Sequence, residues 1–391
     1  GDLNELSLGG ANLIYVALKL LEYERKQNID KAAQFLVIEE PEAHIHTHIQ
    51  KTLFENHVVD KTQVFLSTHS THISSVAKIA EMNILGLDEN RVDVFQPATN
   101  LNTKECSRIE RYLNATRSTL LFAKGVILVE GEAELILIPT LVKKVLGISL
   151  DELGISLITM DSAFFEHISS LFHLDRIRKN CAIITDLDKS IAKLPANEAD
   201  FDDYLRSCFN SQESGKIRKQ KLDEHINGND YVEAFYANHT FEVDFLSAEN
   251  SIELVESLKS IYTSQTHIDK STALLEHSDV SVYGKEVLRL ANKEGKGWFA
   301  LLVSETITSE TYIPKYILNA IAFSCGYKLA PQVLHKMCCY RMNNPMPVFK
   351  DEDKPVEFFK DNSNDINACI SEFVKECADD DLTYLINLLA R

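Results

Sequence analysis

The chain has 391 residues, 45% of them hydrophobic and 25% charged, which is enough for two or three globular domains and excludes a predominantly disordered protein. Its formal net charge of −18 excludes a protein that coats nucleic acid through bulk positive potential, although carboxylates that collect divalent cations are compatible with it. No apolar run reaches the roughly 18 residues of a membrane span, and the start lacks a secretion signal, so we expect a cytoplasmic protein without a membrane partner.

The eight cysteines form no CxxC pair and no regular framework. We therefore expect reduced, mostly buried thiols.

The N-terminal part alternates helix and strand. The pattern predicts a helix over 6–24 and strands at 35–38 and 64–67, as in a parallel α/β sheet. Glycines at the start of this helix allow backbone NH groups to approach a phosphate that the helix dipole favours, and the residues concerned are Ser7, Gly9 and Gly10. Taken alone, they are more readily explained as an ordinary helix cap.

Polar side chains follow both strands. Glu39 and Glu40 end the first, where a metal-binding acid and a water-activating base are useful. His69 follows the second, where it can sense a terminal phosphate or the attacking water, or have a structural role only. Histidines alternate at 44–48, but no Cys or further His stands nearby at the spacing of a zinc site, so we do not expect zinc to bind there.

In order and spacing, these residues resemble the second half of an ABC-type ATPase. The resemblance assigns Ser7, Gly9 and Gly10 to the signature, Glu39 to the Walker B acid, Glu40 to the base and His69 to the switch histidine. Gly10 stands where many signatures have Gln, and Glu39 where Asp is commoner.

No GxxxxGK[ST] phosphate loop occurs in the chain, so we expect no ATP hydrolysis by this polypeptide alone. ATP would bind only if the missing Walker A half is supplied by another chain or by a removed N-terminal portion, and we favour removal.

A second α/β unit follows. Strands at 126–129, 155–160 and 182–185, with helices at 135–146 and near 164–174, predict a βαβαβ order. The charged stretch 195–229 is expected to be a helical or partly mobile excursion and suggests no function. Further helices follow, the last over 366–389. We therefore divide the chain into an ATPase segment at 1–98, a helical linker at 99–123, an α/β domain with helical insertions at 124–325 and a helical tail at 326–391.

Carboxylates follow the first strand of this unit. Glu130 ends the strand at 126–129, Gly131 permits a tight turn, and Glu134 lies one helical turn onward, so the two acids can converge. The alternative is an ordinary helix N-terminus, where the helix dipole favours acidic residues. It explains Glu134 as well as a metal site does, but it explains Glu130 less readily.

A second pair follows the strand at 182–185. Alternation in an extended segment would point Asp186 and Asp188 to the same side. Because ligands of open parallel sheets bind beyond the carboxyl ends of the strands, all four acids should meet at one sheet edge. Such an all-oxygen site suits Mg²⁺ or Mn²⁺ better than zinc.

Two further segments can contribute. Glu242 and Asp244 would hold a second ion, although first-turn acids behind a helix cap at Thr240 are equally plausible. Lys296, between two glycines, would stabilise transition-state charge beside the carboxylates, with Lys293 as its substitute. Considered alone, Lys296 would be an ordinary solvated loop lysine.

A Glu followed by Asp-x-Asp on successive βα units resembles the Toprim fold of topoisomerases, bacterial primases and certain nucleases, over residues 124–298. An ABC half followed by a Toprim domain resembles the OLD (overcoming lysogenization defect) family, over residues 6–300. This family includes the nuclease-ATPase of Gabija antiphage defence and retron-associated relatives.

The resemblance implies a metal-dependent DNA endonuclease or nickase that uses two ions and is regulated by nucleotide. It also implies a homo-oligomer, a dimer or tetramer, that acts in antiphage defence with a partner protein or a retron nucleic acid. In that mechanism the metal ligands are Glu130, Glu134, Asp186, Asp188, Glu242 and Asp244, and Lys296 assists.

Two alternatives belong to other classes. The chain would be a non-catalytic ABC-like dimerisation or partner-binding module in a DNA repair or defence complex if its acidic edge bound no metal. Strand transfer through a tyrosine ranks last because no nucleophile domain is evident.

Overall fold

The computed structural model describes residues 8–25, 35–43, 45–55, 63–88, 91–114, 116–160, 164–344 and 365–390. They form two compact units. The first contains the described residues up to Phe122 together with Asp175–Ile177, and the second contains those from Ala123 onward without that short segment. The finer division into four parts stays a prediction. None of the described helices is long and apolar enough to cross a membrane.

The first unit is built around two pairs of strands. Strands β1 (Phe35–Glu39) and β2 (Gln63–Ser67) pair in parallel, with Phe35 opposite Gln63 and Glu39 opposite Ser67. Strands β3 (Ile84–Asp88) and β4 (Arg91–Phe95) pair antiparallel. The helical elements of this unit are α1 (Leu8–Arg25), α2 (Thr47–Glu55), α3 (Thr71–Ser74), η2 (Ile79–Glu81), α4 (Thr103–Tyr112) and η3 (Arg117–Leu121). Both strands expected here are present, each one residue longer than predicted, and the described helix covers Leu8–Arg25 where 6–24 was expected.

The second unit contains a parallel sheet of strands β5 (Gly125–Val129), β6 (Ile155–Thr159), β7 (Cys181–Asp186) and β8 (Val232–Ala237) in the order β6-β5-β7-β8. The chain passes from β5 to β6 on one side and then places β7 on the other side of β5. The direction of winding therefore reverses at β5, which is where open parallel sheets bind their ligands.

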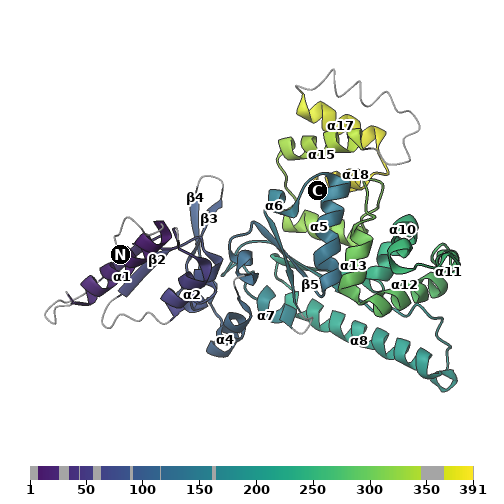
Figure 1. Cartoon of the computed structure of the whole chain (residues 1–391), viewed down its shortest axis with the longest axis horizontal. Coiled ribbons are helices and arrows are strands. Elements are labelled where there is room, and N and C mark those ends of the chain that lie inside the picture. Colours follow the sequence, from purple (N-terminus) through teal and green to yellow (C-terminus); the bar gives the residue numbers. More distant parts are fainter. Residues whose placement is uncertain are drawn as a thin grey trace. The chain divides into compact units, whose positions relative to one another are not determined.

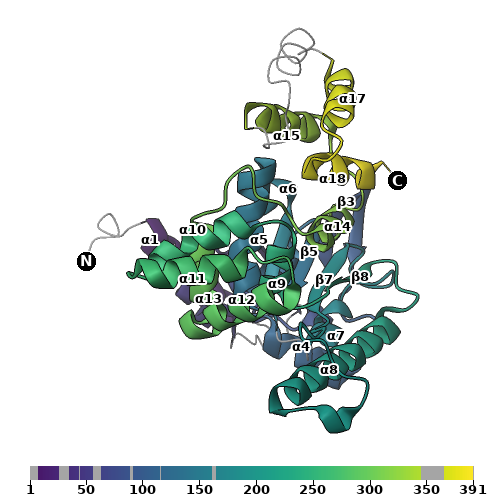
Figure 2. The same ribbon diagram turned by 90° about the vertical axis from the view of Figure 1, so that its right-hand side faces the viewer.

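The sheet lies among many helices (Figures 1 and 2). These elements are α5 (Glu132–Leu146), α6 (Leu150–Leu153), α7 (Phe165–Ser169), η5 (Glu198–Asp200), α8 (Asp203–Ile226), α9 (Phe241–Ser247), α10 (Ser251–Ile261), α11 (Gln265–Leu275), α12 (Val280–Glu294), α13 (Lys296–Ser304), α14 (Lys315–Ser324), α15 (Pro331–Asn343), α17 (Ile366–Glu376) and α18 (Asp381–Leu389). This arrangement confirms the predicted α/β class, with a parallel sheet surrounded by many helices.

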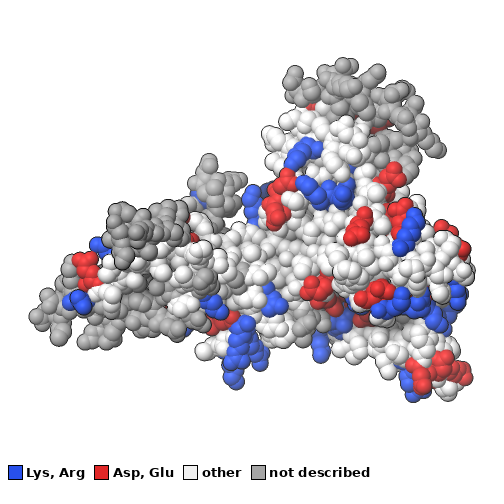
Figure 3. All heavy atoms as spheres, viewed as in Figure 1, with Lys and Arg blue, Asp and Glu red and all other residues white. Residues whose placement is uncertain are grey.

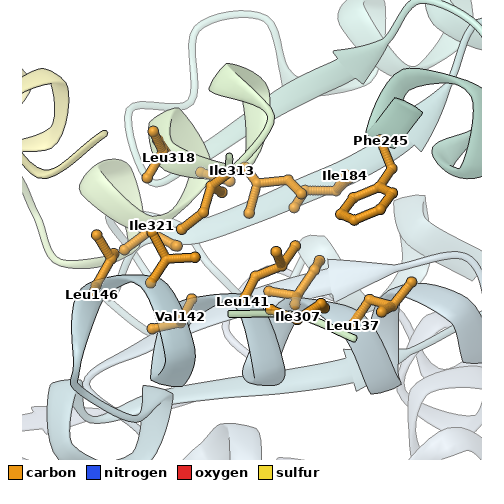
Figure 4. Packing of buried hydrophobic residues seen from close by; sticks show 14 of the residues in the cluster. Leu137, Leu141, Val142, Leu146, Ile184, Phe245, Ile307, Ile313, Leu318 and Ile321 are labelled. Atoms are coloured by element: carbon orange, nitrogen blue, oxygen red, sulfur yellow. The ribbon is translucent and has the colours of Figure 1, made fainter. Parts of the chain in front are cut away.

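All five residues of β5 are buried, so helices cover both of its faces. Helices α5, α9 and α14 and strand β7 contribute to one buried hydrophobic cluster (Figure 4), which includes Leu141, Val142, Ile184, Phe245 and Ile321. Such packing fixes α5, and with it the first turn that follows Glu130, against the sheet.

The tail packs on this core instead of extending away from it. The single helix expected over 366–389 is two helices, α17 and α18, separated at residues 377–380. Arg341 of α15 is fully buried, its Nη2 lies 2.6 Å from Asp380 Oδ2, and its Nη1 donates to the carbonyls of Val145 and Ser309. One guanidinium therefore links α15, the end of α5 and the start of α18.

None of the eight cysteines forms a disulfide, and four of them are buried, whereas most were expected to be.

Candidate functional site

Five carboxylates gather beyond the carboxyl ends of β5 and β7, and we call them the acidic centre: Glu130, Glu134, Asp186, Asp188 and Glu242. Asp186 is the last residue of β7, and its charge interacts with each of the other four. Glu130 immediately follows β5, and Thr185 Oγ1 donates a hydrogen bond to it. The acids predicted from two separate strands thus lie together at the switch point of the sheet.

Glu134 owes its place to the tight start of α5. Gly131 precedes the helix in an extended conformation, and a Cβ added there would lie 3.1 Å from Glu134 Oε2. Glu134 is 5% exposed, and burial raises its pKa to about 7 against the lowering effect of its own backbone NH. Glu132, in the same turn, is exposed. The first turn of α5 therefore sends one acid into the centre and one into solvent.

Burial and four neighbouring carboxylates raise the pKa of Asp186 well above its ordinary value. Like charges this close disfavour full ionisation unless a cation joins them. The acidic centre is consequently a place where positive charge is required.

Asp188 reaches the centre by a route that the sequence did not predict. It does not continue the extended strand, because its φ is +50° in the left-handed region. Its carboxylate is held by Arg218 of α8, whose Nη2 lies 2.9 Å from Asp188 Oδ2 and donates to the carbonyl of Asp186 at 2.5 Å. The predicted convergence is present, but a turn and a cation produce it instead of strand alternation.

Arg218 was missed in the sequence because the stretch 195–229 suggested no function. The guanidinium also lies 3.6 Å from Glu130, Nε to Oε1, so it faces acids from both strands. Gly215, one turn earlier, allows α8 to approach closely, since a Cβ there would lie 2.0 Å from the carbonyl oxygen of Leu187. A glycine three residues before an arginine was the only available signal, and it is a weak one.

The remaining predicted acids, Glu242 and Asp244, lie in the first turn of α9, and their binding of a second ion stays a prediction. Glu242 is 5% exposed and faces Lys296, whose Nζ lies 3.4 Å from Glu242 Oε1. Asp244 instead accepts hydrogen bonds from the backbone NH groups of Asn238 and His239 and from His239 Nδ1 at 2.9 Å. Thr240 stands at the N-cap without a side-chain capping bond.

Lys296 begins α13 directly after Gly295, which has a φ of +87°. Burial works to lower its pKa, but the carboxylates of Glu242, Asp186 and Glu134 outweigh that effect and raise it. Its ammonium group therefore stays charged beside the acidic centre. Lys293 lies over the ring of Tyr262 and beside Glu294 instead.

A further polar group missed in the sequence is Tyr316 of α14. Its hydroxyl is buried and has no hydrogen-bond partner among the described residues. Burial, followed by the charges of Asp186 and Asp244, raises its pKa well above the ordinary value, so the group stays a neutral donor.

The donor set of this centre fits a hard divalent cation, because it consists of carboxylate oxygens alone. Glu242 Oε2 is buried without a hydrogen-bond partner among the described residues, which leaves an acceptor for such an ion. In the described part of the chain, no three His, Cys, Asp or Glu side chains are already arranged to hold a metal ion. Arg218 and Lys296 supply the positive charge in this arrangement.

The raised pKa of Glu134 predicts a pH-dependent stability of the metal-free protein. The ordinary value is 4.5 and the folded value about 7, so the folded protein retains the proton over that interval. The stability that Glu134 contributes is therefore complete below about pH 4.5 and is lost as the pH rises through 7, an effect on the order of 3 kcal/mol. Urea unfolding in EDTA across this interval should show a steeper decline for the native sequence and for Glu132→Gln than for Glu134→Gln. Parallel curves for all three would contradict the assignment.

The first unit brings together two of its predicted site residues. Glu40, with a φ of +42°, turns away from the end of β1, and His69 Nε2 lies 3.4 Å from its Oε1. Glu42 accepts hydrogen bonds from Thr68 Oγ1 and from the NH of His69, both at 2.7 Å, and so fixes the loop after β2. Glu39 is exposed at the end of β1.

Gly9 and Gly10 lie in the first turn of α1, and Ser7 lies outside the described residues. Nucleotide binding by these residues stays a prediction.

Family models match both parts of the chain. The AAA ATPase domain matches residues 1–74, and the Toprim domain described as overcoming lysogenization defect protein-like matches residues 121–188, which include Glu130, Asp186 and Asp188. These two matches support an OLD-type protein that combines an ATPase segment with a Toprim domain. The order of the matched domains, ATPase segment first and Toprim domain second, agrees with the resemblance seen in the sequence.

Solved structures of OLD proteins resemble part of the chain. The C-terminal region of the Burkholderia pseudomallei OLD protein is 25% identical, covers 52% of this chain and 97% of its own length, and has a TM-score of 0.38. The C-terminal region of the Xanthomonas campestris pv. campestris OLD protein is 19% identical, with 53% and 95% coverage and a TM-score of 0.37. No curated protein matches the chain in sequence.

Proposed function

We propose that this OLD protein is a metal-dependent DNA endonuclease or nickase. The observation that carries the proposal is the convergence of five carboxylates and Lys296 at the switch point of the parallel sheet. Buried like charges are costly in a folded protein, and divalent ions that bind a phosphodiester offset that cost. We propose Mg²⁺ or Mn²⁺, two ions, as the cofactor.

Glu130, Glu134, Asp186, Asp188 and Glu242 would hold the ions, with Asp244 contributing after release from His239. Bound there, such ions would supply a water of lowered pKa and would stabilise the leaving oxygen. Lys296, charged and anchored beside Glu242, is placed to stabilise the negative charge that develops on the phosphoryl oxygens. Thr185 orients Glu130 through its hydroxyl.

Plasmid cleavage in Mg²⁺ or Mn²⁺ tests the proposal. Glu130→Ala and Asp186→Ala should remove cleavage, and Lys296→Ala should slow it by about 10²–10³-fold, the usual cost of losing one donor to developing charge. Lys293→Ala is the matched control, because Lys293 lies against Tyr262 and should leave the rate within about twofold. Undiminished cutting by all three site variants would overturn the proposal. Absent metal binding in calorimetry would favour the non-catalytic module.

We further propose nucleotide control, homo-oligomeric assembly as a dimer or tetramer, and a role in antiphage defence with a partner protein or retron nucleic acid. The Glu40–His69 pair supports nucleotide control. In it, the expected base Glu40 and a histidine lie together at the ends of parallel strands, as a site for a γ-phosphate requires. ATP should affect cleavage only when a Walker A segment is supplied.

A further inference from the structure

A groove of about 480 Å³ begins at the acidic centre and follows α8. Asp188 forms one end of it, and the rest of its lining comes from one helix: Asp203, Arg206, Ser207, Asn210, Ser211 and Ser214. Their spacing of three or four residues places them on one face of α8. The groove therefore extends from a carboxylate of the acidic centre along the helix surface.

Every residue that lines the groove has a polar or charged side chain. Three hydroxyls, an amide and a guanidinium are exposed along α8, and no large apolar side chain lines the groove. The guanidinium of Arg206 pairs with no carboxylate among the described residues. Ser, Asn and Arg side chains are donors that proteins use to contact phosphate and sugar without reading sequence. An apolar peptide would find nothing to bury here.

Two contacts fix the groove relative to the acidic centre. At the end near Asp188, Gly215 allows close packing on Leu187, and Arg218 bonds to Asp186 and Asp188. At the other end, Lys285 of α12 lies over the ring of Tyr204, with Nζ 5.1 Å from the ring centroid. The views in Figures 1 and 2 show α8 as a long, straight helix beneath α12.

We propose that this groove binds the phosphodiester backbone of the nucleic-acid strand whose scissile phosphate lies at the acidic centre. The inference rests on the proposed nuclease function and adds the path of the substrate. Arg206 and Ser214 are separated by about 12 Å of helix, which accommodates roughly three phosphates at their ~3.4 Å axial spacing.

The charge distribution makes such a local track necessary. The chain carries a net charge of −18, and Lys and Arg are interspersed with Asp and Glu over the face of the second unit in Figure 3. Long-range attraction of DNA is therefore weak, and strand binding depends on short-range donors. Asp203, at the far end of the groove, opposes binding and so limits the length of the track.

Charge substitutions of opposite sign test the groove by fluorescence anisotropy with a labelled single-stranded or nicked DNA in EDTA. Arg206→Glu should weaken DNA binding at least tenfold. It should also lower by about one the magnitude of the slope of log binding constant against log salt concentration. Asp203→Asn should strengthen DNA binding several-fold. Lys216→Glu is the matched control, because Lys216 is exposed on the same helix but does not line the groove. It should leave binding within about twofold.

A second readout separates this inference from the proposed function. Hydrolysis of bis(p-nitrophenyl) phosphate in Mn²⁺ should be equal for Arg206→Glu and the native sequence, because so small a diester does not reach along α8. If the native protein binds DNA in the predicted pattern but cleaves nothing, the nuclease proposal fails and the groove stands. Absent DNA binding by the native protein, or equal binding by Arg206→Glu and the control, overturns the groove.

Discussion

Glu134→Gln should abolish DNA cleavage, reducing the rate by at least a thousandfold. Glu134 is 5% exposed and interacts with Glu130 and Glu242. Glutamine keeps the size of the side chain but removes the negative charge that a divalent ion requires. Because the residues of one metal centre act together, the loss of a single ligand should cost nearly as much activity as the loss of the whole centre. Plasmid nicking in Mn²⁺, followed over time, measures the loss, and calorimetry measures the accompanying fall in metal affinity.

Glu132→Gln is the control for this substitution. It changes the same residue type in the same turn of α5, with the same effect on the helix dipole, but its side chain points into solvent. Cleavage should stay within about twofold of the native rate. Equal losses in the two variants would show that the dipole of α5, and not the acidic centre, determines the rate.

Arg341→Met should destabilise the second unit by about 3–5 kcal/mol, the range found when one partner of a buried ion pair is removed. The substitution leaves Asp380, 5% exposed, without its guanidinium, and it removes donors from the carbonyls of Val145 and Ser309. Urea unfolding followed by circular dichroism gives the change in the free energy of unfolding.

Lys336→Met provides the comparison on the same helix. Lys336 pairs with Glu152, but its side chain is 56% exposed and that of Glu152 is 38% exposed. Solvent screens exposed pairs, so they contribute little to stability and this variant should unfold almost as the native protein does. A similar cost for both substitutions would show that burial does not determine the energetic role of Arg341.

Much of the sheet and its edge could be predicted from local pattern. The runs at 126–129 and 182–185 are apolar on both faces, which indicates strands covered by helices, and Glu130 and Asp186 mark their ends. Ligands of parallel sheets bind at the carboxyl ends of the strands, and these two acids come directly at the ends of two such strands. Their proximity could therefore be predicted from their positions in the sequence. Gly131 likewise indicated the turn that brings Glu134 back to the centre.

Other features depended on contacts between residues distant in sequence. Arg218 faces Asp188 across 30 positions, and apart from the weak signal of Gly215 it looks like the neighbouring lysines in the charged run. The tail gave no sign that Arg341 would be buried, because an arginine in a helix is usually exposed.

The order of the two units, three of the four strands of the parallel sheet and the acids at its edge could be predicted from the sequence, because hydrophobic periodicity and strand ends are local properties. The tertiary structure alone decided which cations balance those acids, that a left-handed turn and not strand alternation presents Asp188, and that α8 extends the centre into a groove. These outcomes arise from the packing of α8 against the sheet, and such packing depends on the shapes of both surfaces at once.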